Sequence, residues 1–230
     1  MSTVTRSAVT QPASTLVERA ARLLREEILA GKLRPDARIH IYATAARLEM
    51  SPIPIREALR TLASEGLVTP LAQRGYRVRS ATVDDLDDVY NLRMILEPTA
   101  TRMAVPRLNA EDLAHLGRVL TTFEEAVDNG DDAAELASHR AFHFGLFEAS
   151  GSRWLVALLN ILWANSERYR RMSMPHRAVM EQRAREQREI LDACVDGNVE
   201  LAEMLMRQHL DRAYGQIRAW MARLMPQAEP

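Results

Sequence analysis

The sequence predicts a mainly α-helical protein in two parts: an N-terminal unit of three helices and a β-hairpin, then an all-α bundle of six helices. Apolar residues recur at helical spacing through nearly the whole 230-residue chain. Only two short stretches, 67–70 and 76–79, read as strands. Pro and Gly residues mark the ends of the helical segments, so each segment has a predicted start and stop.

Charge divides the chain into a basic and an acidic part. The whole chain is almost neutral, with 30 Lys and Arg against 31 Asp and Glu. Residues 1–80 contain thirteen Lys and Arg against seven Asp and Glu, net +6, and the remainder is net −7. The split favours a nucleic-acid-binding unit joined to an acidic sensing or assembly unit, although chance clustering is the simpler alternative.

Composition also limits the compartment and the class of protein. The single cysteine, Cys194, rules out an internal disulfide, and no apolar run is long enough to cross a bilayer. Residues 1–14 form a short polar arm without the apolar segment of a secretory signal. We therefore expect a cytoplasmic protein that makes no membrane contact.

The N-terminal elements follow one another closely. A first helix over 14–30 opens with Ser/Thr cap candidates and stops at Gly31, and a loop leads to a brief second helix over 42–49. The third helix follows, and then the two strands, joined by a turn that contains Gly75. This order is the winged helix-turn-helix plan, which we expect over residues 15–80, with the third helix in the major groove of DNA.

The third helix begins with two prolines in the sequence SPIPIREALR. Ser51 is a good N-cap, Pro52 falls at the first helical position, and Pro54 still lies in the first turn, where a missing N–H has no intrahelical acceptor. The prolines should therefore start the helix. Arg56 and Arg60 face outward, suited to a guanine edge or a phosphate, unless they only form a solvated basic face.

Residues 81–230 should form the bundle, with a hinge at Ala81-Thr82. The predicted helices cover 83–104, 109–128, 132–149, 152–173, 176–196 and 198–225.

Four polar residues interrupt the apolar stripes of these helices. His139 and His143 are spaced i, i+4, and Gln187 and His209 lie on the apolar stripes of two further helices. If these side chains were buried without hydrogen-bond partners, each would lower the free energy of unfolding by about a few kcal/mol. They should therefore contact each other, a water molecule or an ion. The alternatives are satisfied core residues or a transition-metal site, for which imidazole suits Zn, Ni, Mn or Fe.

Arg93 and Glu97 continue the inward face of the first bundle helix. They form either a buried ion pair at a helix contact or part of a ligand cavity in which Arg93 clamps a carboxylate. Ser166 and Tyr169 are candidate lining residues from the fourth bundle helix.

Several motifs together resemble one family. IREALRTLASEGLV followed by RGYRV is similar to the N-terminal domain of GntR-family transcriptional regulators, and four later motifs resemble the family's FCD effector domain: VYNLRMILEPTATRMA, FHFGLFEASGS, EQREILDACVDGN and RQHL. The resemblance covers the chain from about Thr15, and the six-helix bundle is closer to the VanR-like than to the FadR-like branch. It implies a homodimer, expected to be a repressor, that binds an inverted-repeat operator in double-stranded DNA under the control of a small organic acid.

The chain departs from the family pattern at several functional positions. The family usually has Ser-Arg-Thr-Pro where this chain has Ser51-Pro52-Ile53-Pro54, so base reading should depend more on Arg56. The DNA-contacting set implied is Ser51, Ile53, Arg56, Arg60, Gln73, Arg74 and Gly75. The family's metal ligands, one aspartate and three histidines, fall on His139, His143, Gln187 and His209 in that order, so two of the four differ and binding of a divalent metal should be weaker or of a different ion.

No enzyme motif accompanies these residues. The histidine pair reads His-Arg-Ala-Phe-His and lacks the Glu that a zinc peptidase helix uses as base, and there is no Gly-rich phosphate loop. Cys194 lies on an apolar stripe and reads as core. We expect no catalysis; the alternative to a regulator is a helical metal-binding or protein-interaction module that does not bind DNA.

Overall fold

The structure is a computed structural model that describes residues 15–72, 75–173 and 177–224. Contacts divide the chain into two compact units, Met1–Arg79 and Ser80–Pro230. The expected arm, residues 1–14, lies outside the described residues. Among the helices described, none is both long and apolar enough to span a membrane.

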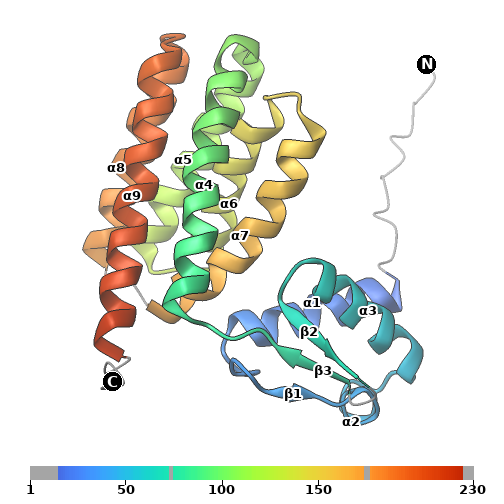
Figure 1. Cartoon of the computed structure of the whole chain (residues 1–230). Coiled ribbons are helices and arrows are strands. Elements are labelled where there is room, and N and C mark those ends of the chain that lie inside the picture. The colour runs from blue at the N-terminus through green and yellow to red at the C-terminus, as the bar shows by residue number, and fades with distance from the viewer. Residues whose placement is uncertain (1–14, 73–74, 174–176, 225–230) are drawn as a thin grey trace, which may run out of the picture. The chain divides into compact units, whose positions relative to one another are not determined.

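Three helices form most of the N-terminal unit (Figure 1). Helix α1 (Leu16–Leu29) begins at a capping box, in which the Thr15 hydroxyl accepts from the Glu18 N–H and the Glu18 carboxylate accepts from the Thr15 N–H. Helix α2 (Ile41–Arg47) is short, and α3 (Pro52–Ser64) follows it. The core of the unit includes Ala20, Leu24, Ile28, Ile55, Leu59 and Leu62.

Helix α3 starts at the two prolines, as the sequence predicts. Ser51 has the extended backbone of an N-cap, and Pro52 and Pro54 lie within the first turn. Both prolines therefore lack only N–H groups that would have no acceptor inside the helix. Pro54 and Ile55 are buried, so the start of α3 is also fixed by packing against the core.

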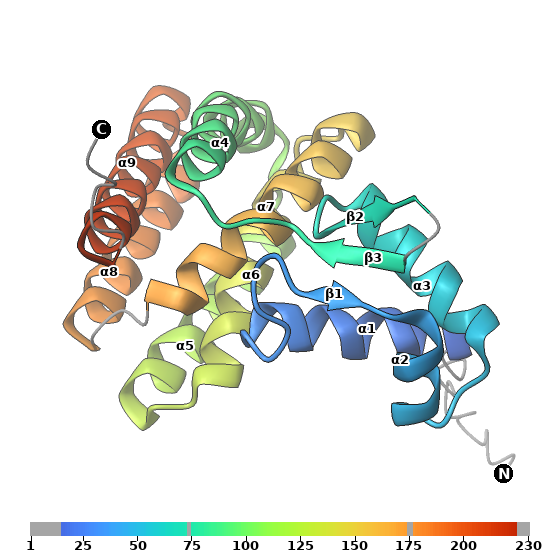
Figure 2. The ribbon, with the colours of Figure 1, turned by 60° about the horizontal axis from the view of Figure 1, so that its bottom comes forward.

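A three-stranded antiparallel sheet completes the unit. Strands β2 (Val68–Leu71) and β3 (Gly75–Val78) form the predicted hairpin, and β1 (Arg38–Ile39) pairs with the other edge of β3 (Figure 2). The sequence analysis placed β1 in a loop, and that assignment was wrong. A strand of two residues has no detectable alternation, and only its pairing with β3 defines it.

The second unit contains six α-helices among the described residues (Figure 1). Their bounds agree with the predicted helices to within one or two residues: α4 (Val83–Ala104), α5 (Ala110–Asn129), α6 (Asp132–Glu148), α7 (Arg153–Ser173), α8 (Arg177–Val195) and α9 (Val199–Leu224). A short 3₁₀ turn (Val105–Arg107) follows α4. The predicted fold class, a winged helix-turn-helix followed by six helices, is confirmed.

The helices of the bundle surround two apolar clusters. Helix α4 packs against α7 and α9, α5 packs against α6 and α8, and α8 packs against α9. The larger cluster contains Leu120, Phe123, Phe142, Phe147 and Trp163, and a smaller one joins α4, α7 and α9 around Tyr90 and Tyr169. Buried polar and charged side chains from α4, α6, α7, α8 and α9 also lie in this interior.

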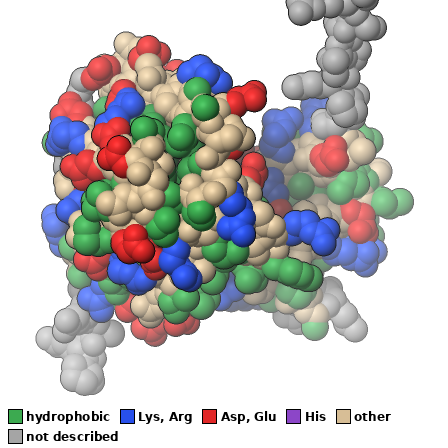
Figure 3. Space-filling view, turned by 90° about the horizontal axis from the view of Figure 1, so that it is seen from above, with side chains coloured by type: hydrophobic (Ala, Val, Ile, Leu, Met, Phe, Trp, Pro, Cys, Tyr) green, Lys and Arg blue, Asp and Glu red, His purple; other side chains and the backbone are tan. Residues whose placement is uncertain are grey.

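The surface of the bundle is mixed in character. On the face shown in Figure 3, acidic, basic and hydrophobic side chains are interspersed over the helical unit. Trp163 is buried, whereas Trp154 is 81% exposed. Periodicity could not separate the two residues because both lie on one helix within a generally apolar sequence.

Candidate functional site

The exposed face of α3 carries two arginines and one apolar side chain. Arg56 makes no hydrogen bond or ion pair with any residue that the structure describes, whereas Arg60 pairs with Glu57 at 2.7 Å on the same helix. Ile53, in the first turn, is 72% exposed. Arg56 is therefore available for a base edge, and Ile53 presents an apolar surface suited to a thymine methyl group.

Ser51 marks the start of α3 without capping it through its side chain. Its hydroxyl makes no cap hydrogen bond. An N-cap serine normally accepts from the N–H of the second or third helical residue, and Pro54 removes the N–H of the third. The second proline thus leaves the Ser51 hydroxyl exposed for another partner.

A groove of about 810 Å³ runs beside this face within the N-terminal unit. Its lining comes from β1, α2, α3 and the hairpin and contains three arginines but no carboxylate. The polar and aromatic side chains that line it are Arg38, His40, Tyr42, Arg56, Arg60 and Tyr76. A positively charged groove of this kind suits the phosphate backbone of a nucleic acid.

The wing residues Gln73 and Arg74 lie outside the described residues. Gly75 follows them with φ +90°, and a Cβ atom built on it would lie 2.5 Å from the backbone oxygen of Ile39. Gly75 is therefore required for the close approach of β3 to β1. The sequence analysis placed Gly75 among the DNA-contacting residues implied by the resemblance, and the structure supplies a reason for glycine within the fold.

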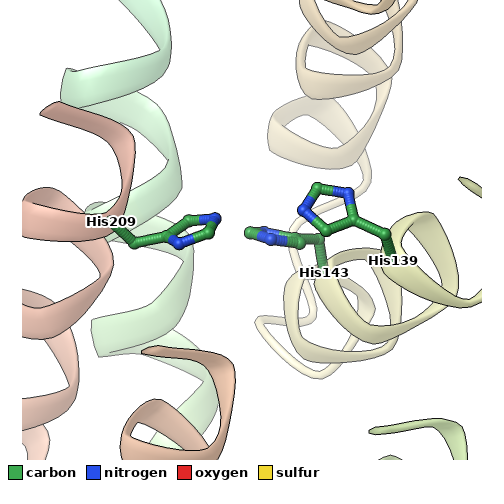
Figure 4. A group of neighbouring side chains, drawn as sticks. All are labelled: His139, His143 and His209. Atoms are coloured by element: carbon green, nitrogen blue, oxygen red, sulfur yellow. The ribbon is translucent and has the colours of Figure 1, made fainter. Parts of the chain in front are cut away.

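Three histidines meet in the interior of the bundle (Figure 4). His139 and His143 project from α6, and His209 reaches toward them from α9; their ligand atoms all lie within 4.8 Å of one another. All three are at most 3% exposed. Gln187 of α8, the fourth polar residue of the sequence pattern, is also fully buried.

His143 and Gln187 have unused hydrogen-bonding groups. Nε2 of His143 and both amide atoms of Gln187 have no hydrogen-bond partner, although both side chains are fully buried, and Nδ1 of His143 lies 3.5 Å from Oε2 of Glu97. Burial is the largest cause that lowers the pKa of His143, to about 4, so its imidazole is neutral at pH 7. A neutral imidazole and an amide oxygen without partners are available to a metal ion or another ligand.

Hydrogen bonds set the tautomers of the other two histidines. Nδ1 of His209 lies 2.7 Å from Oε2 of Glu186, which can only accept, so Nδ1 donates and Nε2 keeps its lone pair. Nη1 of Arg170 lies 2.6 Å from Nδ1 of His139. Because a guanidinium can only donate, Nδ1 of His139 accepts and its Nε2 carries the proton. Burial and then Arg170 lower the pKa of His139 well below its usual value.

These contacts test the fit of a divalent metal. His209 is oriented by Glu186 as metal-bound histidines commonly are, and Nε2 of His143 and the amide of Gln187 lack hydrogen-bond partners. His143 and His209, whose ligand atoms lie close together, therefore fit a metal. His139 fits poorly, because Arg170 occupies one ring nitrogen and the other is protonated.

Arg93 and Glu97 form the buried ion pair that the sequence analysis considered. Nε of Arg93 lies 2.5 Å from Oε1 of Glu97, and Oε2 of Glu97 lies 3.5 Å from Nδ1 of His143. The Arg93 guanidinium lies 4.8 Å from the ring centre of Tyr90 and 5.0 Å from that of Trp163. Its terminal nitrogens make no hydrogen bond within the described chain. Arg93 can therefore form the ion pair with Glu97 through Nε and still bind a carboxylate through its terminal nitrogens.

Ser166 and Tyr169 are buried but engaged elsewhere. The Ser166 hydroxyl donates to the carbonyl of Trp163 at 2.9 Å. The Tyr169 hydroxyl donates to Oδ2 of Asp85 at 2.6 Å, within the cluster near the start of α4. Tyr169 therefore joins α7 to the start of α4 through its hydroxyl.

Sequence reasoning missed three charged residues of the centre, Arg170, Arg183 and Glu186, all of which are buried. Arg183 could have been found, because it lies one turn before Gln187 on the inward face of α8. Arg170 and Glu186 gave no comparable signal.

The fold and the basic face of α3 define a DNA-binding transcriptional regulator. Residues 16–78 match the family described as bacterial regulatory proteins, gntR family, and residues 88–212 match the FCD domain. The chain belongs to the GntR family and carries an FCD domain. This is a family of regulators and not of enzymes, and the match sets aside a helical module that does not bind DNA.

Curated relatives and solved structures agree with this assignment. The chain is 30% identical to BphR of Paraburkholderia xenovorans, an HTH-type transcriptional regulator, over 89% of this chain and 86% of BphR. It is 29% identical to GlaR of Escherichia coli, an HTH-type transcriptional repressor, over 82% and 90%. Escherichia coli McbR/YncC has the same fold, with a TM-score of 0.78 and 22% identity over 89% and 98% of the two chains.

Proposed function

We propose that the protein is a dimeric transcriptional repressor whose affinity for an inverted-repeat operator is set by a small carboxylate bound in the FCD domain beside a divalent metal. The observation that carries the proposal is that two fully buried side chains, His143 and Gln187, have polar atoms without hydrogen-bond partners, and that His143 adjoins the Arg93–Glu97 pair. Polar groups in this state raise the energy of the ligand-free protein, and a ligand that satisfies them is bound correspondingly well.

The metal would be held by His143, His209 and Gln187, with His139 as a fourth ligand only after Arg170 moves. When bound, a divalent ion supplies a Lewis acid for one carboxylate oxygen of the effector. The glutamine oxygen is a weaker ligand than the imidazole that the family has there, so the affinity should be lower than the family's. Gln187→His should therefore tighten metal binding, whereas His143→Ala should abolish it, both measured by metal titration of the purified protein.

The effector would be oriented by Arg93. Its terminal nitrogens are free for a carboxylate, and Glu97 holds its Nε in place. Binding must favour one arrangement of the DNA-binding units over another to change operator affinity. Operator affinity that stays the same across saturating carboxylate and metal would rule out that ligand as the effector.

Apolar side chains on α4 and α7 support a dimer. Leu92 and Ile95 of α4 and Trp154, Leu158 and Ile161 of α7 are 38% to 81% exposed, and the two helices pack against each other. An apolar surface of this kind suits a second copy of the chain. Leu158→Glu should shift the protein to monomers in sedimentation experiments. Met204→Glu, at an exposed position on α9, is the control and should leave the mass unchanged.

The repressor assignment draws on the description of GlaR as a repressor.

DNA reading is tested by Arg56→Ala, with Arg60→Ala as the matched control on the same helix. Arg56→Ala should weaken specific binding to the operator by about 1–3 kcal/mol and non-specific binding much less. Arg60 is held by Glu57, so its loss should act mainly through charge and affect both kinds of binding alike. Equal losses in both for Arg56→Ala would remove its base-reading role.

A further inference from the structure

Arg183 of α8 is a buried cation without a counter-ion. Its side chain is 4% exposed, and no carboxylate in the described chain lies within ion-pair distance of it. Its one hydrogen-bond contact is the sulfur of Met180, 3.9 Å from Nη1, and its Nε has no partner. A guanidinium in this position has lost its hydrating water without gaining a carboxylate. This desolvation raises the free energy of the folded protein considerably unless a ligand supplies a negative charge.

A second guanidinium reinforces this positive region. Arg170 of α7, also buried, donates to His139 and has an Nε without a hydrogen-bond partner. Its carboxylate neighbour, Glu167, is shared with Arg171. The positive charge of Arg170 lowers the pKa of Arg183, and the charges of both arginines lower the pKa of His139. Two arginines therefore converge beside the histidine centre with too little negative charge between them.

The one acid near both arginines does not neutralise them. Glu135 of α6 lies beyond ion-pair distance of Arg183, and its buried Oε1 has no hydrogen-bond partner. Burial raises the pKa of Glu135, which weakens it further as a counter-ion. Burial likewise lowers the pKa of Arg183, to about 10, but it remains charged at pH 7. Glu186 also raises the pKa of Arg183, but its carboxylate is already shared by His209 and Arg212, so an anionic ligand is the further source of negative charge.

We propose that Arg183 and Arg170 bind a second anionic group of the effector, so that the effector is a dicarboxylate. The inference rests on the proposed function, in which Arg93 and the residues around His143 take the first carboxylate. Arg183 and Gln187 lie one helical turn apart on α8, so a carboxylate bound by Arg183 would lie about 6 Å along that helix from a metal held by Gln187. Dicarboxylates of about four to six carbons fit this spacing, and a guanidinium fork binds a carboxylate through two hydrogen bonds.

The first test needs no ligand and compares two buried arginines of the full-length protein. Arg183→Met removes an uncompensated charge and should raise the melting temperature by about 2–6 °C. The control, Arg93→Met, leaves Glu97 unpaired and should lower it. If Arg183→Met lowers the melting temperature as well, Arg183 has a structural partner and the inference fails.

The second test measures binding of succinate, glutarate and adipate by titration calorimetry, each beside the monocarboxylate of the same chain length. We expect at least one dicarboxylate to bind the wild type about tenfold or more tightly than its monocarboxylate, and Arg183→Met to remove that advantage without changing monocarboxylate binding. A preference that is absent, or that survives in Arg183→Met, overturns the inference.

The two proposals fail in different ways. If monocarboxylates bind and weaken operator binding but dicarboxylates bind no better, the proposed function stands and the second subsite is wrong. If neither class binds with metal present, the proposed carboxylate effector is wrong as well. Operator binding without ligand, measured in parallel, shows that each variant still folds and binds DNA.

Discussion

Glu97→Gln should destabilise the bundle strongly, because it leaves the Arg93 guanidinium without its anion in the interior. The Arg93–Glu97 pair has side chains that are 4% and 1% exposed, with Nε and Oε1 2.5 Å apart. Removing one partner of a buried pair costs about 3–5 kcal/mol. For a chain of this size, that corresponds to a fall in melting temperature of roughly 6–20 °C.

The assay is thermal and urea unfolding, followed by circular dichroism, of a double-mutant cycle. Glu97→Gln and Arg93→Met are measured singly and together, and the double variant should recover part of the loss because no unpaired charge is left. Glu57→Gln is the control: it breaks the same kind of pair on the surface of α3, where Arg60 and Glu57 are 63% and 43% exposed. That change should cost less than about 1 kcal/mol.

The reasoning would be refuted if Glu97→Gln cost no more than Glu57→Gln. In that case the Arg93 guanidinium must have water or another anion in the folded protein, and the interior would be more solvated than the contacts indicate. The double variant gives an independent check, since a purely additive cycle would mean that the two side chains do not interact.

Three further predictions concern single groups. Gly75→Ala should destabilise the N-terminal unit by about 1–3 kcal/mol, measured by urea unfolding, because its Cβ would meet the Ile39 oxygen at positive φ; unchanged stability would mean that the hairpin adjusts freely. Thr15→Ala should cost about 1 kcal/mol through loss of the capping box, whereas Ser51→Ala, at a cap without a side-chain bond, should cost much less; equal losses would contradict this. Burial raises the pKa of the Cys194 thiol to about 12, so a thiol reagent at pH 8 should label the native protein only at the rate of unfolding, and immediate labelling would show that it is accessible.

The helices could be predicted from the sequence because their signals are local. Capping residues, prolines in the first turn and glycines after the last turn lie within a few residues of the ends they mark, as at Thr15, Pro52 and Gly130. Inward-facing polar residues were also detectable, since His139, His143, Gln187 and His209 interrupt apolar stripes. Each of these inferences needed only one helix at a time.

The features that the sequence did not reveal depend on contacts between distant segments. Strand β1 exists because Arg38 and Ile39 pair with β3. Arg170 belongs to the histidine centre because α7 packs so that its guanidinium reaches His139, 31 residues away in the chain. Likewise, the exposure of Trp154 depends on which face of α7 the other helices cover. Periodicity identifies a buried face but not the element that covers it.

The charge balance of the centre connects the departure at His139 with the unpaired Arg183. Each buried glutamate near the centre is already engaged: Glu97 with Arg93, Glu167 with Arg170 and Arg171, and Glu186 with Arg212 and His209.

The family places an aspartate at the position of His139, and a carboxylate there would face Arg170 and supply one negative charge. The neutral imidazole supplies none, so the substitution leaves the centre one charge more positive. The same change weakens the attraction for a divalent cation and strengthens it for an anion. A site altered in this way favours a ligand with more negative charge of its own. One carboxylate would be enough to bind Arg93 and a metal, and the extra positive charge is the reason for expecting a second carboxylate.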